Sequence, residues 1–135
     1  VREVQGKSPV RIILNPSLSI KKDFKIFSIE GQNLIYNTHK SEETGNSTYI
    51  NLEKFNLKNI LKDLYSRNIS SIIVEGGLQT LSSFIESNIW NEARVYVGES
   101  EFKSGLAAPK ISEQFQLSST QLENEKLYFY KNTDC

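Results

Sequence analysis

The chain has 135 residues, enough for one domain with one core, so we predict a single domain over residues 1–135. Its 16 basic and 16 acidic residues balance, which gives no electrostatic reason to expect a nucleic acid or an anionic membrane as partner. The apolar runs are far shorter than a membrane span requires, so no membrane association is expected.

Cysteine and histidine are scarce. The single cysteine, Cys135, excludes a disulfide within the chain, and together with His39 it is too little to hold a metal ion. The first residues lack the apolar core of a signal peptide. These features predict a cytoplasmic protein without a metal centre.

Short strands dominate the expected N-terminal half. Residues 10–14 form a nearly continuous apolar run and residues 25–29 alternate in character, so both predict strands. Residues 34–36 and 48–52 are further strand candidates. Residues 37–47 are polar throughout and predict a mobile loop.

Two helical patterns flank the next apolar run. Apolar residues recur at helical spacing over residues 57–67, and this helix should stop near Asn68. Residues 72–74 are wholly apolar and predict a buried parallel strand. The second helix follows at once and should end near Asn88. Its predicted inward face consists of Leu78, Leu81, Ile85 and Ile89.

The C-terminal part predicts strands again. Residues 93–97 form one strand, residues 98–114 are irregular, and residues 115–122 and 127–130 predict an antiparallel hairpin. A βαβαβ centre followed by an antiparallel tail indicates an α/β fold with a mixed sheet.

Glu75, Gly76 and Gly77 stand between the apolar run and the second helix. In open α/β sheets, ligands collect at the carboxyl ends of strands, and a helix N-terminus there can bind phosphate. Two glycines would let a phosphate reach the backbone. The pattern is not the full dinucleotide fingerprint, so a plain turn is the alternative reading. A carboxylate fits badly beside a phosphate, so Glu75 should face a sugar or a substrate.

A family resemblance rests on these residues. Residues 74–77, followed by Thr80-Leu81, Phe84-Ile85 and residues 90–97, resemble the end of the reductase domain of the bifunctional riboflavin-biosynthesis deaminase/reductase. Residues 9–15, Pro-Val-Arg-Ile-Ile-Leu-Asn, are similar to the Pro-x-Arg-x-x-x-Asp strand of the same domain. The two anchors occur in the family's order.

The resemblance implies a dihydrofolate-reductase-like fold, with a mostly parallel mixed sheet, flanking helices and a C-terminal antiparallel hairpin. It implies NADPH as hydride donor and reduction of 5-amino-6-(5-phosphoribosylamino)uracil to the ribitylamino product. Glu75 would be the catalytic residue facing the substrate. The cofactor-binding residues implied by the resemblance are Asn15, Ser17, Gly76, Gly77, Leu78, Gln79, Thr80, Leu81, Ser82 and Ser83.

The chain also departs from the family. Asn15 stands where the family has Asp, which removes a charge. The family's reductase domain begins before the segment that matches Val1, so we expect an N-terminally incomplete domain. No His-x-Glu with Pro-Cys-x-x-Cys occurs here, so the deaminase chemistry is not encoded in this segment.

Two alternatives stay open at this stage. The chain could be a dihydrofolate-reductase-like reductase of another pterin or pyrimidine, since the Glu-Gly-Gly run is shared across that superfamily. It could also be a non-catalytic fragment that binds a nucleotide or serves in assembly. An open sheet flank further predicts a homodimer with the C-terminal strands near the contact.

Overall fold

The computed structural model describes residue 6, residues 8–101 and residues 103–134. The chain divides into two compact units, unit 1 (Val1–Ser70) and unit 2 (Ser71–Cys135). The single domain over residues 1–135 stays a prediction. Cys135, and most of the N-terminal residues used to predict the absence of a signal peptide, lie outside the described residues.

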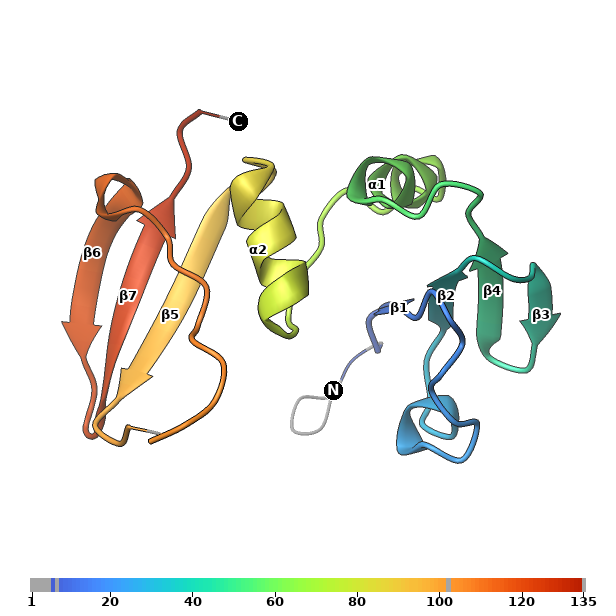
Figure 1. Ribbon diagram of the computed structural model, residues 1–135, viewed down its shortest axis with the longest axis horizontal. Helices are drawn as coiled ribbons and strands as arrows, with labels where there is room; N and C mark the ends of the chain where they lie inside the picture. Colours follow the sequence, from blue (N-terminus) through green and yellow to red (C-terminus); the bar gives the residue numbers. More distant parts are fainter. Residues whose placement is uncertain (1–5, 7, 102, 135) are drawn as a thin grey trace. The chain divides into compact units, whose positions relative to one another are not determined.

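Unit 1 is built on a four-stranded sheet, sheet A, with strand order β1-β2-β4-β3 (Figure 1). Its strands are β1 (Arg11–Leu14), β2 (Asn33–Asn37), β3 (Glu42–Thr44) and β4 (Ser47–Asn51). β1, β2 and β4 run parallel, whereas β3 pairs antiparallel with β4. The strands predicted at residues 10–14, 34–36 and 48–52 are therefore confirmed, and the sheet is mixed and mostly parallel.

β2 is buried along its whole length because both faces of sheet A are covered. On one face, the Tyr36 hydroxyl donates a hydrogen bond of 2.7 Å to Asp63 of helix α1. On the other face, the Asn33 amide donates to the Ile26 carbonyl at 3.3 Å. Alternate side chains of a strand point to opposite faces, so Ile35 shares the Asn33 face. A strand covered on both faces reads as a continuous apolar run, and the centre of β2, residues 34–36, is such a run between two buried asparagines.

Residues 25–29 do not form the predicted strand, and this expectation was wrong. The segment contains a short 3-10 helix, η1 (Lys25–Phe27). Two of its carbonyls accept from side chains of sheet A, since the Asn33 amide donates to Ile26 at 3.3 Å and the Arg11 guanidinium donates to Ile29 at 3.1 Å. Carbonyls that accept from side chains in this way are not available to a strand ladder.

The polar stretch 37–47 is not wholly a loop either. Thr44 pairs with Ser47 across Gly45 and Asn46, which makes a two-residue hairpin between β3 and β4. Gly45 has φ +60°, as the first central residue of a type II′ turn requires. The Gly-Asn pair was a hairpin signal, and the polar composition of the stretch hid it.

Both helices begin and end close to where the sequence predicted. α1 (Leu57–Ser66) is capped by Asn56, whose side chain accepts a 2.9 Å hydrogen bond from the Asn59 amide. At its end Asn68 adopts φ 62°, and the Ile69 N–H donates to Leu64 at 3.1 Å. α2 (Leu78–Glu86) in unit 2 ends in the same way, with Asn88 at φ 54°. Each helix thus closes with an Asn-Ile Schellman motif.

The sheet of unit 2, sheet B, is antiparallel, with strand order β5-β7-β6. Its strands are β5 (Glu92–Gly98), β6 (Gln116–Gln121) and β7 (Glu125–Lys131), and the 3-10 helix η2 (Glu113–Phe115) precedes β6. The predicted C-terminal hairpin is confirmed as β6 and β7. The Asn132 amide donates to Asn88 at 2.8 Å and so joins the end of β7 to the end of α2.

The apolar run at residues 72–74 does not form the buried strand that was predicted. Residues 71–77 belong to no strand, and Ile73 is 88% exposed. A strand needs backbone partners as well as apolar side chains, and among the described residues sheet B of unit 2 consists of β5, β6 and β7. The inward face of α2 also differs, because Phe84 is its buried residue whereas Leu78 and Ile89 are exposed.

Candidate functional site

The carboxyl ends of β1 and β2 lie together at one edge of sheet A. The Asn15 N–H, just past β1, donates to the Tyr36 carbonyl at 3.0 Å. The Leu52 N–H, just past β4, donates to the Asn37 carbonyl at 2.8 Å. This is the edge at which ligands bind in parallel sheets, and it is the first candidate site.

Residues 15–19 form a closely held loop at this edge. The Asn15 side-chain oxygen accepts hydrogen bonds from the Ser19 N–H at 3.0 Å and from the Ser19 hydroxyl at 3.3 Å. The Pro16 carbonyl accepts from both the N–H and the hydroxyl of Thr38, at 3.1 Å and 3.0 Å. Ser17 lies exposed between these two attachments. Ser17 is therefore exposed on a loop whose backbone is held by hydrogen bonds on both sides of it.

Helix α1 is hydrogen-bonded to β2 next to this edge, through Asp63 and Tyr36. Burial and the hydrogen bond to Asp63 raise the pKa of the Tyr36 phenol far above its ordinary value. Burial opposes the charge on Asp63, but hydrogen bonds from Arg67 and Tyr36 outweigh it and lower the pKa of this carboxyl. The Arg67 Nε donates to Asp63 at 2.6 Å. Since the Tyr36 carbonyl also holds Asn15, one residue connects the helix to the loop.

The second candidate site is the start of α2 in unit 2. Gly77 is the N-cap residue and supplies no side-chain hydrogen bond, and no acidic residue lies in the first turn. The Leu81 N–H is bonded to the Gly77 carbonyl at 3.2 Å. The N–H groups of the first turn, at residues 78–80, are therefore the donors available to an anion.

The two glycines have no packing role of their own within the described residues. Neither adopts a positive φ, and Gly77 has φ −73°. A Cβ built on Gly77 would meet nothing within 4 Å, and one on Gly76 would only touch Thr80 at 3.6 Å. Glycine at these positions is thus not required by the backbone or by crowding. It leaves space in front of the helix N-terminus.

The predicted site residues fall into two groups. Asn15 and Ser17 share the loop of unit 1, whereas Glu75 and residues 76–83 are contiguous in unit 2. Glu75 is exposed immediately before the glycines. The Ser83 hydroxyl donates to the Gln79 carbonyl at 2.8 Å, so it is bonded within the helix. The assignments of all these residues stay predictions.

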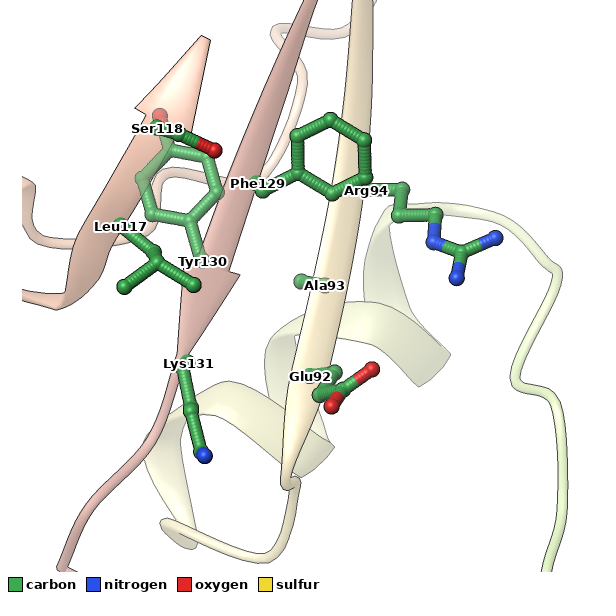
Figure 2. A pocket seen from close by; sticks show the side chains of 8 residues that line it. All are labelled: Glu92, Ala93, Arg94, Leu117, Ser118, Phe129, Tyr130 and Lys131. Atoms are coloured by element: carbon green, nitrogen blue, oxygen red, sulfur yellow. The ribbon is translucent and has the colours of Figure 1, made fainter.

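A hollow of about 270 Å³ lies on sheet B, and none of the residues that line it is a predicted site residue. Figure 2 shows Phe129 and Arg94 at one end of it, with Glu92 and Lys131 at the other. The Arg94 guanidinium carbon lies 5.8 Å from the centre of the Phe129 ring. The lining residues are Glu92, Ala93, Arg94, Leu117, Ser118, Phe129, Tyr130 and Lys131. An apolar floor with charged ends is typical of a protein contact surface.

Sequence reasoning missed Ser19 and Thr38, the two residues that hold the loop. The spacing of Asn15 and Ser19 was a weak signal, because an Asn side chain often bonds the backbone a few residues on. Thr38 gave no signal, since its bond to Pro16 joins segments that meet only in the folded sheet.

The part of the chain that the structure describes has neither a metal site nor a membrane-spanning helix. No group of three or more His, Cys, Asp or Glu side chains there could hold a metal ion. Among the described residues, no helix has the length and apolar character needed to cross a bilayer.

One protein family matches most of the chain. The sequence model of the family described as "RibD C-terminal domain" matches residues 1–127. The riboflavin biosynthesis protein RibD of Aquifex aeolicus is 33% identical over 129 residues, which are 87% of this chain and 36% of that protein. The chain thus spans little more than a third of that relative.

Two solved structures share the fold. One is a diaminohydroxyphosphoribosylaminopyrimidine deaminase/5-amino-6-(5-phosphoribosylamino)uracil reductase from Thermotoga maritima. It is 23% identical with a TM-score of 0.78, over 97% of this chain and 40% of that one. The other is a riboflavin biosynthesis reductase of Saccharomyces cerevisiae, 17% identical with a TM-score of 0.72, over 94% of this chain and 71% of that one. The dihydrofolate-reductase-like fold class is thereby confirmed.

Proposed function

We propose a reductase activity for this chain from one premise: the chain belongs to the RibD C-terminal domain family. The proposed reaction is the NADPH-dependent reduction of 5-amino-6-(5-phosphoribosylamino)uracil to its ribitylamino product, within the cytoplasm. The name of the Thermotoga relative includes this uracil reductase activity. The activity is proposed for an enzyme that contains this domain within a longer chain, as the Thermotoga relative does.

The observation that carries the proposal is the space before α2. A phosphate needs N–H donors, a positive helix end and no side chain in its way. Residues 78–80 supply the donors, no acid lies in the first turn, and a Cβ on Gly77 would stand in open space. These features fit a phosphate of NADPH, so residues 76–80 are the proposed phosphate site.

The other predicted residues also have proposed roles. Asn15 and Ser17 are proposed, from the family resemblance alone, to bind NADPH. When bound, NADPH supplies the hydride that reduces C1′ of the ring-opened sugar. Glu75 stands next to the glycines but carries a charge that phosphates repel, so it is proposed to orient a sugar hydroxyl of the substrate or to assist proton transfer.

Gly77 allows a sharp test, because one substitution has opposite effects on folding and on binding. Asp is a better N-cap than Gly and its charge favours the helix dipole, so Gly77→Asp stabilises α2. The same charge repels a phosphate. We expect NADPH affinity to fall by roughly a hundred-fold or more, by calorimetry, with an unfolding midpoint equal to or above that of the unmodified chain.

Gly77→Ser is the matched control, since Ser also caps the helix but adds no charge. Its NADPH affinity should lie between those of the unmodified chain and Gly77→Asp. Equal NADPH binding by all three would refute the phosphate site. Turnover of 5-amino-6-(5-phosphoribosylamino)uracil, followed by loss of NADPH absorbance in the enzyme that contains this domain, tests the substrate. Turnover of dihydrofolate instead would favour the pterin alternative.

A homodimer is the remaining part of the proposal. Tyr96, Val97 and Leu117 of sheet B are exposed, and so is Leu122, directly after β6. Exposed large apolar side chains can mark a protein contact. We propose that a second copy covers them, and expect Leu117→Lys to shift the sedimenting species from dimer to monomer. A monomer at every concentration before the substitution would contradict this.

A further inference from the structure

Unit 2 has an apolar extended segment, residues 71–75, that pairs with no other strand in the described part of the chain. Exposure alternates along it, since Ile72 and Val74 are half-buried whereas Ile73 is 88% exposed. Such alternation is the pattern of a β-strand, whose successive side chains point to opposite faces. Among the described residues, however, no backbone hydrogen bond joins this segment to another. The segment therefore has the side-chain pattern of a strand without its hydrogen bonds.

Helix α2, which follows this segment, has an apolar side that is only partly covered. Leu78, Leu81 and Ile85 recur at helical spacing, and Ile89 continues the same line just past the helix. We call these four residues the outer stripe of α2. Leu78 is 36% exposed and Ile89 is 42% exposed, whereas the buried Phe84 lies about a third of a turn away from the stripe. An apolar stripe on a helix is normally buried against a sheet or another helix, so the outer stripe is open to a further element.

Strand β5 has an open edge as well. It pairs with β7 on one side, and no described residue pairs with its other side. Helix α2 connects residues 71–75 to β5, in the order extended segment, helix, strand (Figure 1). In a unit of this kind the two extended segments normally run parallel within one sheet, and the helix covers a face of that sheet. Residues 71–75 and β5 are not paired with each other, so one strand between them would join both into one sheet.

We infer that residues 71–75, the open edge of β5 and the outer stripe of α2 form an acceptor for one extended apolar strand, supplied by the longer enzyme that contains this domain. Solved structures with this fold are longer, since the chain covers 71% of the Saccharomyces reductase and 40% of the Thermotoga enzyme. A strand fits the acceptor better than a helix does, because only a strand can bond to unpaired N–H and carbonyl groups on both of its sides. Its side chains should be apolar, because residues 72–74 and the outer stripe carry no charge.

The added strand also fixes the proposed phosphate site, and this part of the inference rests on the proposed function. Glu75 ends the acceptor segment, and Gly76 and Gly77 connect it to the first turn of α2. A Cβ at Gly77 would meet nothing within 4 Å, so packing does not hold this connection. Once residues 71–75 are paired, the connection is held at both ends. Glu75 and the N–H groups of residues 78–80 then lose less freedom when a ligand binds.

Amide exchange tests the acceptor without any cofactor. In the 135-residue chain, the amides of residues 72–75 should exchange at close to the rate of an unfolded chain. In the longer enzyme they should exchange roughly a hundred-fold or more slowly, because the added strand accepts from them. Equal exchange in both proteins overturns the inference. Protection that rises with the concentration of the 135-residue chain means that a second copy occupies the acceptor, and it overturns the assignment to the longer enzyme.

Ile73→Lys tests the acceptor through stability, with Leu106→Lys as the matched control. Both side chains belong to unit 2 and are 88% exposed. Neither substitution should move the unfolding midpoint of the 135-residue chain, because neither side chain is packed. In the longer enzyme, Ile73→Lys places a charge among the apolar side chains of paired strands and should lower the midpoint by more than about 3 °C. Leu106→Lys should leave it unchanged. Equal midpoints for the two variants of the longer enzyme overturn the inference.

Calorimetry with NADPH separates the acceptor from the proposed function. Measured well below the unfolding midpoint, Ile73→Lys should weaken NADPH binding by the longer enzyme roughly ten-fold, because residues 71–75 no longer hold the phosphate site. Unchanged affinity refutes the link between the added strand and that site. If the unmodified longer enzyme protects residues 72–75 but does not bind NADPH, the proposed function fails and the acceptor stands.

Discussion

The central strands of the two sheets differ sharply in burial. β2 of sheet A is buried at each of its five residues, whereas β7 of sheet B has no buried residue along its seven. Both strands have a neighbour on each side, so position within a sheet does not explain the difference. Sheet A has α1 on one face and residues 25–31 on the other. What covers the faces of a sheet, and not the order of its strands, decides how much a strand contributes to the core.

Two leucines give the largest expected contrast between the units. Leu34 in β2 is 2% exposed and Leu117 in β6 is 71% exposed. Leu34→Ala should lower the free energy of unfolding by about 2–5 kcal/mol, because it opens a cavity in a packed core. Leu117→Ala should change it by less than about 0.5 kcal/mol.

The two substitutions need probes that report on each unit separately. The chain's single tryptophan, Trp90, lies in unit 2, with its ring 5.4 Å from that of Phe115. Its fluorescence should follow unit 2 during urea unfolding, and amide exchange in β2 should follow unit 1. A large cost of Leu117→Ala in dilute solution would mean that sheet B is covered after all.

Two glycines extend the comparison to the backbone. Gly31 in unit 1 has φ +111°, and a Cβ there would lie 3.1 Å from both the Arg11 guanidinium and Ser8. Gly31→Ala should therefore cost about 1–3 kcal/mol of unfolding free energy. Gly77→Ala in unit 2 meets open space and should cost less than about 1 kcal/mol, the difference between Gly and Ala as N-cap. Thermal unfolding of both variants measures the contrast, and equal costs would contradict it.

The buried phenol of unit 1 should make stability depend on pH. Tyr36→Phe removes the hydrogen bond to Asp63 and should cost about 1–2 kcal/mol of unfolding free energy at neutral pH. Tyr96→Phe, on an exposed side chain of unit 2, is the control and should cost nothing measurable. Urea unfolding at neutral pH compares them.

The signs of the pH effects follow from the two pKa shifts. The pKa of Asp63 is lower in the folded chain than the ordinary 3.8, so its stabilising effect is present above that pH and is lost as the pH falls through the folded value. The pKa of Tyr36 is raised, so its effect is lost as the pH rises above the ordinary 10.0. Asp63→Asn should reduce the loss of stability at low pH. Tyr36→Phe should reduce the loss of stability at high pH. An unaltered pH profile in either variant would show that the pair is not what titrates.

The smallest contrast concerns the matching ends of the two helices. Asn68→Gly in unit 1 relieves a left-handed conformation and should add about 0.5 kcal/mol to the unfolding free energy. Asn88→Gly relieves the same strain but removes an acceptor from the buried Asn132, so it should lower stability by about 1 kcal/mol. Opposite signs in thermal unfolding would support this account, whereas equal shifts would show that the Asn132 contact is weak.

The sequence predicted those elements whose signal is local. Helix boundaries at Asn68 and Asn88 followed from composition and spacing, as did the strands β1, β2 and β5. The strand predicted at residues 25–29 does not form, because side chains distant in the sequence, such as that of Arg11, donate hydrogen bonds to the carbonyls of this segment. The strand predicted at residues 72–74 does not form either, because an apolar sequence does not tell which other strand would supply its backbone hydrogen bonds.

Some residues of the candidate site could likewise be predicted from the sequence, and others could not. The glycines before α2 were visible in the sequence because a change of periodicity surrounds them. The proposed role of Asn15 comes only from a family resemblance, and the hydrogen bonds from Ser19 that hold its side chain were seen only in the structure. Thr38 could not be foreseen, because its bond to Pro16 forms between two strands that are distant in sequence.

The parallel pairing of β1 with β2 also sets an order of events during folding. The β3–β4 hairpin joins Thr44 to Ser47 across two residues and should close within about 1–10 μs. Arg11 finds Asn33 only after the chain between them has closed into a long loop, and such non-local pairing is slow. We therefore expect pulse-labelled exchange to protect β4 before β1. The edge that carries Asn15 is then among the last parts of unit 1 to be assembled, so a chain halted partway through folding would have its hairpin but not the loop at residues 15–19.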